Sequence, residues 1–120
     1  MVAEPVDNLD GLLAAALEAL PQPVMLYDVD RVVFANAASW QMLGASAPGD
    51  VIGARLDQFL TPDFADASNE RRQLVVSEGV ELSNVRVKIR TLDGRTLTLN
   101  VDVRPLSFGD VTLAMVTLAR

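Results

Sequence analysis

The chain has 120 residues, half of them hydrophobic, which suits a single domain with its own core. Its net charge of −6 disfavours nucleic acid as a partner, because phosphate binding depends on clustered Lys and Arg. Cysteine and histidine are both absent, which excludes disulfides, thiolate nucleophiles and metal sites built on those ligands. No apolar run approaches the ~20 residues that span a bilayer. No leader peptide is recognisable either, so we expect a cytoplasmic protein without membrane insertion.

Residues 1–20 are predicted to form a lead-in and an amphipathic helix, and residues 21–120 the domain proper. Asp7 or Asn8 can cap this helix, and Pro21 ends it. Its apolar stripe consists of Leu9, Leu12, Leu13, Ala16, Leu17 and Leu20. Two interpretations are open: the stripe covers the domain's own sheet, or it forms the interface of a homodimer.

Two short strands, residues 24–27 and 31–35, are predicted around a turn at residues 28–30. Both are nearly continuous apolar runs, which are typical of strands covered on both faces. Asn36 is expected to cap the helical turns that follow and that stop at Gly44.

A longer helix is predicted from Pro62 to about Glu78. Thr61 is a cap residue, proline favours the first helical position, and Gly79 stops the helix. The stripe predicted for its inner side consists of Phe64, Ala67, Arg71, Leu74, Val75 and Glu78. Because this stripe is weaker than the first, we expect the helix to be partly exposed.

A hairpin is predicted over residues 85–103, where two runs of apolar/polar alternation flank an Asp-Gly pair. A two-residue loop would put the two apolar sets on opposite faces. A three-residue loop over residues 92–94 pairs Ile89 with Leu97 and brings both sets to one face. Gly94 then occupies the position that needs positive φ, so we predict a type I turn with a G1 bulge. The opposite face is polar and expected to be solvated: Arg86, Lys88, Arg90, Thr96, Thr98, Asn100 and Asp102.

The remaining strands complete a sheet. The apolar phase changes near Ser83 and Asn84, which predicts a β-bulge there. Residues 111–119 are apolar on both faces, so this last strand is predicted to be central, with the first strand as its neighbour. Helices clustered within an antiparallel sheet give an α+β domain.

Four segments then carry a family resemblance: residues 23–36, 36–38, 51–55 and 92–95. They are similar, in order, to the opening hairpin with its Asn, the N-x-A step, the v-i-G-k stretch and the D-G-R turn of PAS domains. The chain therefore resembles the PAS/PAC sensor fold family over nearly its whole length. The resemblance implies a five-stranded antiparallel sheet in the order 2-1-5-4-3, with short helices inserted between strands 2 and 3.

The same resemblance bears on cofactors. Light-sensing flavin relatives carry Cys directly after the Asn, where this chain has Ala37. Haem-binding relatives use a His on the long helix. Since neither residue type occurs in the chain, haem and a cysteinyl-flavin are both disfavoured and no cofactor is expected. A methionine as axial haem ligand stays open.

Relatives in the family keep their ligands between the inner sheet face and the short helices. The corresponding candidates here are Tyr27, Phe34, Asn36, Trp40, Met42, Leu56, Phe59, Leu99, Val101 and Met115. The alternative is that all of them are core residues. A filled core or a small pocket is favoured over a cofactor site, because the chain has one Trp, one Tyr and only four Phe.

Three functional hypotheses result. The first is a non-catalytic regulatory sensor and dimerisation module of a larger signalling protein, of the histidine kinase, cyclase or transcription regulator type. The second is a sensor domain that binds a small apolar metabolite. The third is a cone-fold isomerase with Asp28 as base and Tyr27 as oxyanion donor, although neighbours on a strand point to opposite faces. A sheet order other than 2-1-5-4-3 would favour this third hypothesis.

Overall fold

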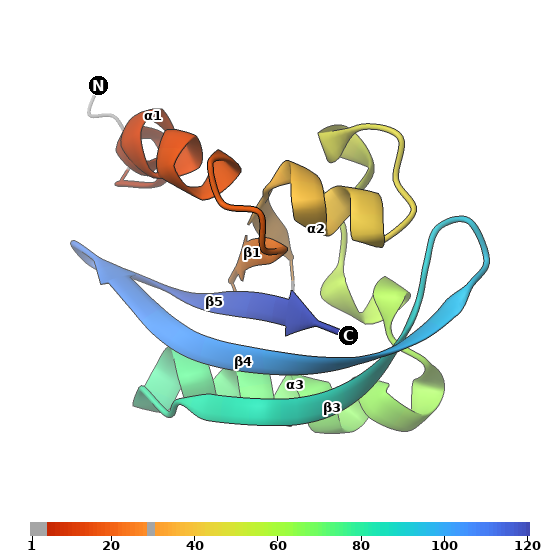
Figure 1. The fold of residues 1–120 in the computed structure, drawn as a ribbon. Coiled ribbons are helices and arrows are strands. Elements are labelled where there is room, and N and C mark those ends of the chain that lie inside the picture. Colours follow the sequence, from red (N-terminus) through yellow and green to blue (C-terminus); the bar gives the residue numbers. More distant parts are fainter. Residues whose placement is uncertain (1–4, 29–30) are drawn as a thin grey trace.

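Five antiparallel strands form one sheet in the order β2-β1-β5-β4-β3, which confirms the expected order (Figure 1). The computed structural model describes residues 5–28 and 31–120. The strands are β1 (Val24–Tyr27), β2 (Val32–Ala35), β3 (Leu82–Arg90), β4 (Thr96–Phe108) and β5 (Val111–Ala119). The helices are α1 (Pro5–Glu18), α2 (Ala37–Met42) and α3 (Pro62–Glu78), with the 3-10 turns η1 (Pro48–Asp50) and η2 (Leu56–Phe59). None of the helices in the described ranges has the length and apolar character needed to cross a membrane.

β1 and β5 are neighbours inside the sheet, as predicted. All four residues of β1 are buried, and β1 pairs with β2 on one side and with β5 on the other. Val24 lies opposite Thr117, so the start of β1 is next to the end of β5. The turn before β2 contains Val29 and Asp30, which lie outside the described residues.

The β3–β4 hairpin has the predicted register. Ile89 lies opposite Leu97, which confirms the three-residue loop. Gly94 has φ of +91°, and its N–H donates to the carbonyl oxygen of Thr91 at 3.1 Å. The predicted bulge is also present, because the register shifts between Leu82 and Val85. All apolar side chains of both arms therefore face the same side of the sheet.

Asn84 forms the bulge. Its φ of +55° makes it the one described non-glycine residue with positive φ. Its N–H donates to the Asp102 carboxylate at 2.7 Å, which gives the unpaired backbone group of the bulge a partner.

The tip of the hairpin packs against the end of α2. The Leu92 N–H donates to the carbonyl oxygen of Leu43 at 2.8 Å. Gly44, next in the chain, has φ of +78°, and a Cβ placed on it would lie 2.5 Å from Oδ1 of Asp93. Glycine is therefore required at position 44 both by the backbone conformation and by the close approach of the loop.

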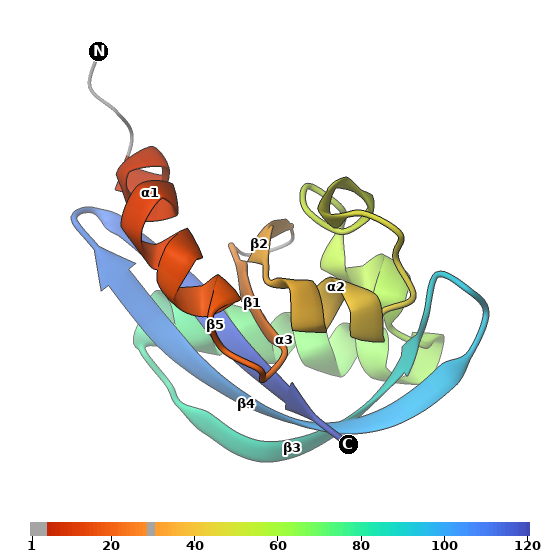
Figure 2. The ribbon, with the colours of Figure 1, turned by 45° about the horizontal axis from the view of Figure 1, so that its top comes forward.

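The sheet has two differently covered faces. The inner face packs against α2, η2 and α3, and α1 lies on the other side of the sheet from α3 (Figure 2). On the outer face, Leu17 of α1 packs with Val24, Leu26 and Leu113. Towards β3 this outer face is polar, and Arg86, Lys88 and Arg90 are exposed as predicted.

The apolar residues predicted for the first helix fall into two groups, one buried on the sheet and one exposed. Leu17 is buried against the domain's own sheet. Leu12 is 80% exposed, Leu20 is 42% exposed and Ala16 is exposed. The side chains of Leu9 and Leu13 lie outside the described part of the structure. The own-sheet interpretation therefore holds for Leu17, and the interface interpretation remains a prediction for the exposed leucines.

The inner stripe predicted for α3 was wrong in two places. The helix begins after Thr61 and ends at Gly79, as expected. However, Leu74 is 40% exposed and Glu78 is exposed, whereas Arg72 is 97% buried (3% exposed). Arg72 can be buried because neighbouring side chains of its own helix accept its hydrogen bonds, and this turns the face that carries it towards the sheet.

Candidate functional site

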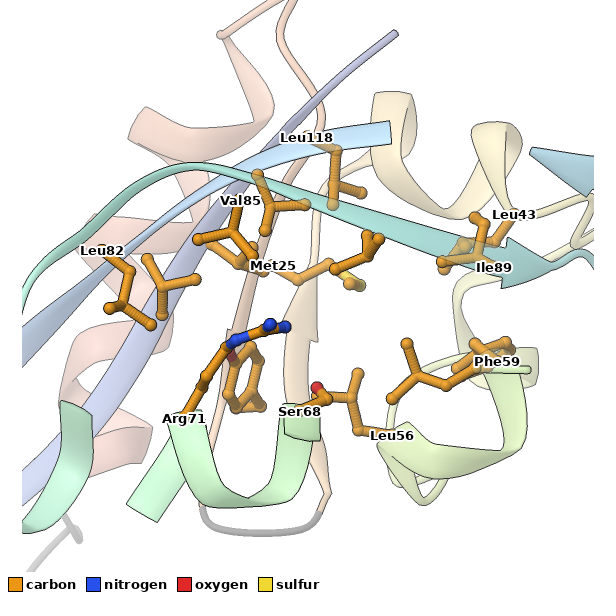
Figure 3. A pocket seen from close by; sticks show the side chains of 16 residues that line it. Met25, Leu43, Leu56, Phe59, Ser68, Arg71, Leu82, Val85, Ile89 and Leu118 are labelled. Atoms are coloured by element: carbon orange, nitrogen blue, oxygen red, sulfur yellow. The ribbon is translucent and has the colours of Figure 1, made fainter. Parts of the chain in front are cut away.

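A cavity of about 60 Å³ lies between the inner face of the sheet and the segment formed by η2 and α3 (Figure 3). The residues that line it are Met25, Tyr27, Leu43, Leu56, Phe59, Leu60, Ser68, Arg71, Leu82, Val85, Val87, Ile89, Val101, Val103, Val116 and Leu118. All of them are apolar except Tyr27, Ser68 and Arg71. This volume is well below the roughly 300 Å³ at which pockets for drug-sized ligands begin.

Several predicted site residues lie in or near this cavity. Those that line it are Tyr27, Leu56, Phe59 and Val101. Leu99 is buried in the same core, and Trp40 and Met42 pack partly buried against it, but these three do not line the cavity. Most of the predicted site residues therefore lie in the inner core. Only those on the side of η2 and α3 border the cavity.

Phe34 and Met115 lie on the other face of the sheet. Both are opposite Leu26 in the neighbouring strands, and all three pack in the outer cluster under Leu17. The inward direction expected for Met115 does not hold, because on β5 it shares its face with Leu113. The inner face of β5 is instead formed by Ala114, Val116 and Leu118.

Asn36 is buried but acts at a junction outside the cavity. Its Oδ1 accepts from the N–H groups of Val24 and Ser39, both at 3.0 Å. Its Nδ2 donates to the carbonyl oxygens of Leu17 at 3.0 Å and Gln22 at 2.8 Å. The bond from Ser39 confirms the predicted cap of α2. The other three bonds join the end of α1 and the start of β1 to that cap.

Tyr27 and Asp28 lie in different surroundings, since Tyr27 is buried in the inner core and Asp28 is only half-buried. Burial raises the pKa of Tyr27 to about 12, an effect that the charge of Arg72 partly opposes. Tyr27 therefore presents a neutral phenol to the cavity at neutral pH. Asp28 belongs instead to the turn before β2, where its Oδ1 accepts from the Arg31 N–H at 2.8 Å. The isomerase hypothesis would have been favoured by a sheet order other than 2-1-5-4-3, and the observed order is 2-1-5-4-3.

Two consecutive arginines of α3 face the interior, and their surroundings differ. Nη1 of Arg72 donates to Ser68 Oγ at 3.1 Å, and its Nη2 donates to Asn69 Oδ1 at 3.3 Å. Nη1 of Arg71 is buried and has no hydrogen-bond partner among the described residues. Neither arginine was among the predicted site residues. Arg71 was predicted on the inner side of this helix but not as a site residue, and Arg72 was not predicted to face inward, because charged helix residues are mostly exposed.

Acidic groups that could hold a metal ion are dispersed over the surface. Within residues 5–28 and 31–120, no three Asp or Glu side chains come close enough together to bind one. The cavity lining contains no carboxylate. The polar chemistry of the site is therefore that of a phenol, a hydroxyl and a guanidinium.

Comparison with known proteins agrees with this architecture. The family model described as "PAS domain" matches residues 11–75. Sporulation kinase A of Bacillus subtilis (strain 168) is 27% identical over 89 residues, which cover 74% of this chain and 14% of that protein. This chain thus spans about one seventh of the length of that curated relative.

Solved structures show the same fold at low sequence identity. The PAS domain of nitrogen regulation protein NR(II) from Vibrio parahaemolyticus has a TM-score of 0.70 and 19% identity, with 91% of this chain and 97% of that chain covered. The PAS domain of a protein from Colwellia psychrerythraea has a TM-score of 0.75 and 12% identity, with 92% and 95% covered. With the family model matched over more than half of its residues, the chain belongs to the PAS domain family.

Proposed function

We propose that this domain is a non-catalytic, cytoplasmic sensor and dimerisation module of a larger signalling protein of the histidine kinase type. The relative from Bacillus subtilis is a kinase by name, and the matched segment is a small part of it. The observation that carries the proposal is the junction at Asn36. It connects α1, which packs on the outer face of the sheet, to α2, which packs on the inner face.

The junction gives a physical route for a response. The Ala37 N–H at the start of α2 donates to Glu18 Oε1 at the end of α1, at 2.7 Å. Together with the bond from Asn36 to the Leu17 carbonyl, this means that a displacement of α2 is passed on to the last turn of α1. Leu17 packs that turn against the sheet. A movement of α2 can therefore change the direction of α1 relative to the sheet.

The dimerisation part rests on the free side of α1. Leu12 on α1 and Leu20, two residues after its end, are the exposed large apolar side chains among those described in this part of the chain. Two copies of α1 that pack through these leucines would remove apolar surface from water, at roughly 1.5–3 kcal/mol for each leucine fully buried.

Sedimentation of the purified chain over a range of concentrations tests this part. We expect reversible dimers, and we expect Leu12→Glu to weaken the dimer by at least about 10-fold, since an unpaired carboxylate would enter an apolar contact. Leu92→Glu is the matched control, because Leu92 is an exposed leucine on the hairpin tip and far from α1 in the chain. A wild-type chain that stays monomeric at all concentrations would contradict the proposal.

A second candidate function is small-molecule sensing, which the cavity specifically favours. Native mass spectrometry of the purified protein and a thermal-shift screen of small metabolites test it. We propose that haem and a cysteinyl-flavin are not the ligands. The reasons are that the chain has no His and no Cys and that the cavity has only about 60 Å³.

A further inference from the structure

Arg71 extends from α3 into the cavity towards Met25, with Ser68 beside it on the same helix (Figure 3). We propose that the cavity binds a short-chain monocarboxylate, with the carboxylate on Arg71 and Ser68 and the alkyl part against the apolar lining. This inference rests on the proposed sensing role of the cavity and names the class of its ligand.

The first argument is one unsatisfied nitrogen of the Arg71 guanidinium. Nη1 of Arg71 is buried without a hydrogen-bond partner among the described residues. No acidic residue is among the sixteen that line the cavity. A buried cationic donor without an acceptor is unfavourable, and an anion that enters the cavity would remove this penalty. Because an anion relieves this penalty and a neutral ligand does not, the cavity should bind negatively charged ligands more tightly than neutral ones of the same shape.

The neighbouring arginine shows that α3 satisfies a buried guanidinium where no ligand is needed. Arg72, although 97% buried (3% exposed), finds acceptors on Ser68 and Asn69. These groups lie one turn earlier on the same helix, the spacing at which helical side chains meet. Arg71 lacks such partners for Nη1 and points instead into an apolar space.

Ser68 supplies a second donor. Its Oγ accepts the hydrogen bond from Arg72 Nη1, which leaves the hydroxyl proton able to donate to another group. Ser68 and Arg71 are three residues apart on α3 and both line the cavity. A carboxylate has two oxygens, so one can accept from the guanidinium and the other from the hydroxyl.

The size and polarity of the cavity restrict the rest of the ligand. About 60 Å³ admits an alkyl group of only a few carbons beyond the carboxylate. Met25, Val116 and Leu118 present apolar surface to that part. A dicarboxylate or a phosphate dianion would bury a second charge without another cation in the lining, which opposes its binding. Acids of the size of acetate, propionate and butyrate meet these conditions.

Thermal unfolding in sodium propionate, with sodium chloride at matched ionic strength and the neutral isostere propionamide, tests the inference. We expect propionate, at roughly 100-fold above its Kd, to raise the Tm of the wild type by about 10 °C, and the other two to leave it unchanged. Arg71→Met should bind propionate at least about 10-fold more weakly, since it loses the charge-assisted bond. Without propionate, this variant should be at least as stable as the wild type, because methionine suits the apolar space and removes the unpaired donor. Arg90→Met is the matched control, an exposed arginine on the outer face of β3, and should respond like the wild type.

Two results would overturn the inference: an equal stabilisation by propionamide, or a full response to propionate in Arg71→Met. The absence of any response to the three acids in the wild type would also overturn it. If Arg71→Met does not fold, the wild type alone decides by nuclear Overhauser contacts from the propionate methyl group to Met25 and Leu118, which are expected at saturation. Sedimentation of the ligand-free chain is unaffected by these outcomes, so the proposed dimerisation module can stand or fail separately.

Discussion

Replacement of Asn36 by alanine tests the junction between α1, β1 and α2. The side chain is fully buried and makes four hydrogen bonds, and all four partners are backbone groups. Truncation at Cβ would leave two N–H donors and two carbonyl acceptors without this partner. Two of these groups keep another partner, because the Ser39 N–H also donates to the Asn36 carbonyl oxygen and the Leu17 carbonyl oxygen also accepts from the Leu20 N–H.

The expected cost follows from these groups. A buried polar group that loses its partner costs roughly 1–3 kcal/mol, and the Ser39 N–H loses a helix cap worth about 1 kcal/mol. Because two of the four groups keep another partner and a water molecule can occupy part of the space left by the amide, the sum is reduced to about 4 kcal/mol. That is a large share of the roughly 5–15 kcal/mol that stabilises a typical domain.

Urea unfolding, followed through the fluorescence of Trp40, measures this cost, since the chain has a single tryptophan. Asn36→Asp is informative beside the alanine variant. It retains the acceptor for Val24 and Ser39 but turns a carboxylate oxygen towards two carbonyl oxygens, so we expect it to be destabilised at neutral pH and less so in acid. Asn100→Ala, at a partly exposed position of β4, is the control and should change stability by less than about 0.5 kcal/mol. If Asn36→Ala costs less than about 1 kcal/mol, the junction does not depend on this side chain and the reasoning is refuted.

Three further predictions concern single positions. Gly44→Ala should cost about 1–2 kcal/mol more than Gly53→Ala in urea unfolding, because both have positive φ but only at position 44 would the Cβ collide with Asp93. Asn84→Gly should be neutral or slightly stabilising and Asn84→Ala should cost about 1 kcal/mol, since φ is +55°; equal effects would contradict this. The single tyrosine, Tyr27, should titrate near pH 12 in the tyrosinate absorption band, and a midpoint near 10 would show that its ring is not buried. As its pKa is higher in the folded state than in the unfolded state, stability is fully present below pH 10 and is lost towards pH 12 by about 3 kcal/mol, a loss that Tyr27→Phe should abolish.

The hairpin and the strand order followed from patterns that are local in the sequence. Alternation in both arms of β3 and β4 allowed only one loop length that keeps a single apolar face, and Ile89 does lie opposite Leu97. The two-sided apolar character of β1 and β5 likewise indicated central strands. These features depend on residues that are close in sequence or on a simple count of faces.

The direction of each face was harder to predict. On a strand that is apolar on both sides, alternation separates the two sets but does not tell which one faces the short helices. Met115 and Phe34 were assigned to the inner side for that reason, and only the packing of Leu17 on the outer face decides otherwise. Because α1 covers the outer face, β1 and β5 need apolar residues on both faces, and the two faces look alike in the sequence.

The burial of Arg72 beside the cavity was also beyond the reach of the sequence pattern. Burial of Arg72 depends on acceptors from Ser68 and Asn69, whose side chains meet it only in the folded helix. This orientation exposes Leu74 and directs Arg71 into the cavity. The predicted stripe included Arg71 correctly, but it also included the exposed Leu74 and missed the buried Arg72, because periodicity counts hydrophobic residues.

The position of β1 next to β5 has a mechanical consequence. Val24 pairs with Thr117, and the Leu118 N–H donates to the carbonyl oxygen of Pro23, so both strands reach the same end of the sheet at this point. The hydrogen bonds between antiparallel strands lie perpendicular to them. A force that separates Pro23 from Leu118 therefore loads these bonds one after another, as when a zip is opened, rather than all at once. The sheet yields gradually to tension applied there, while it resists sliding of β1 along β5.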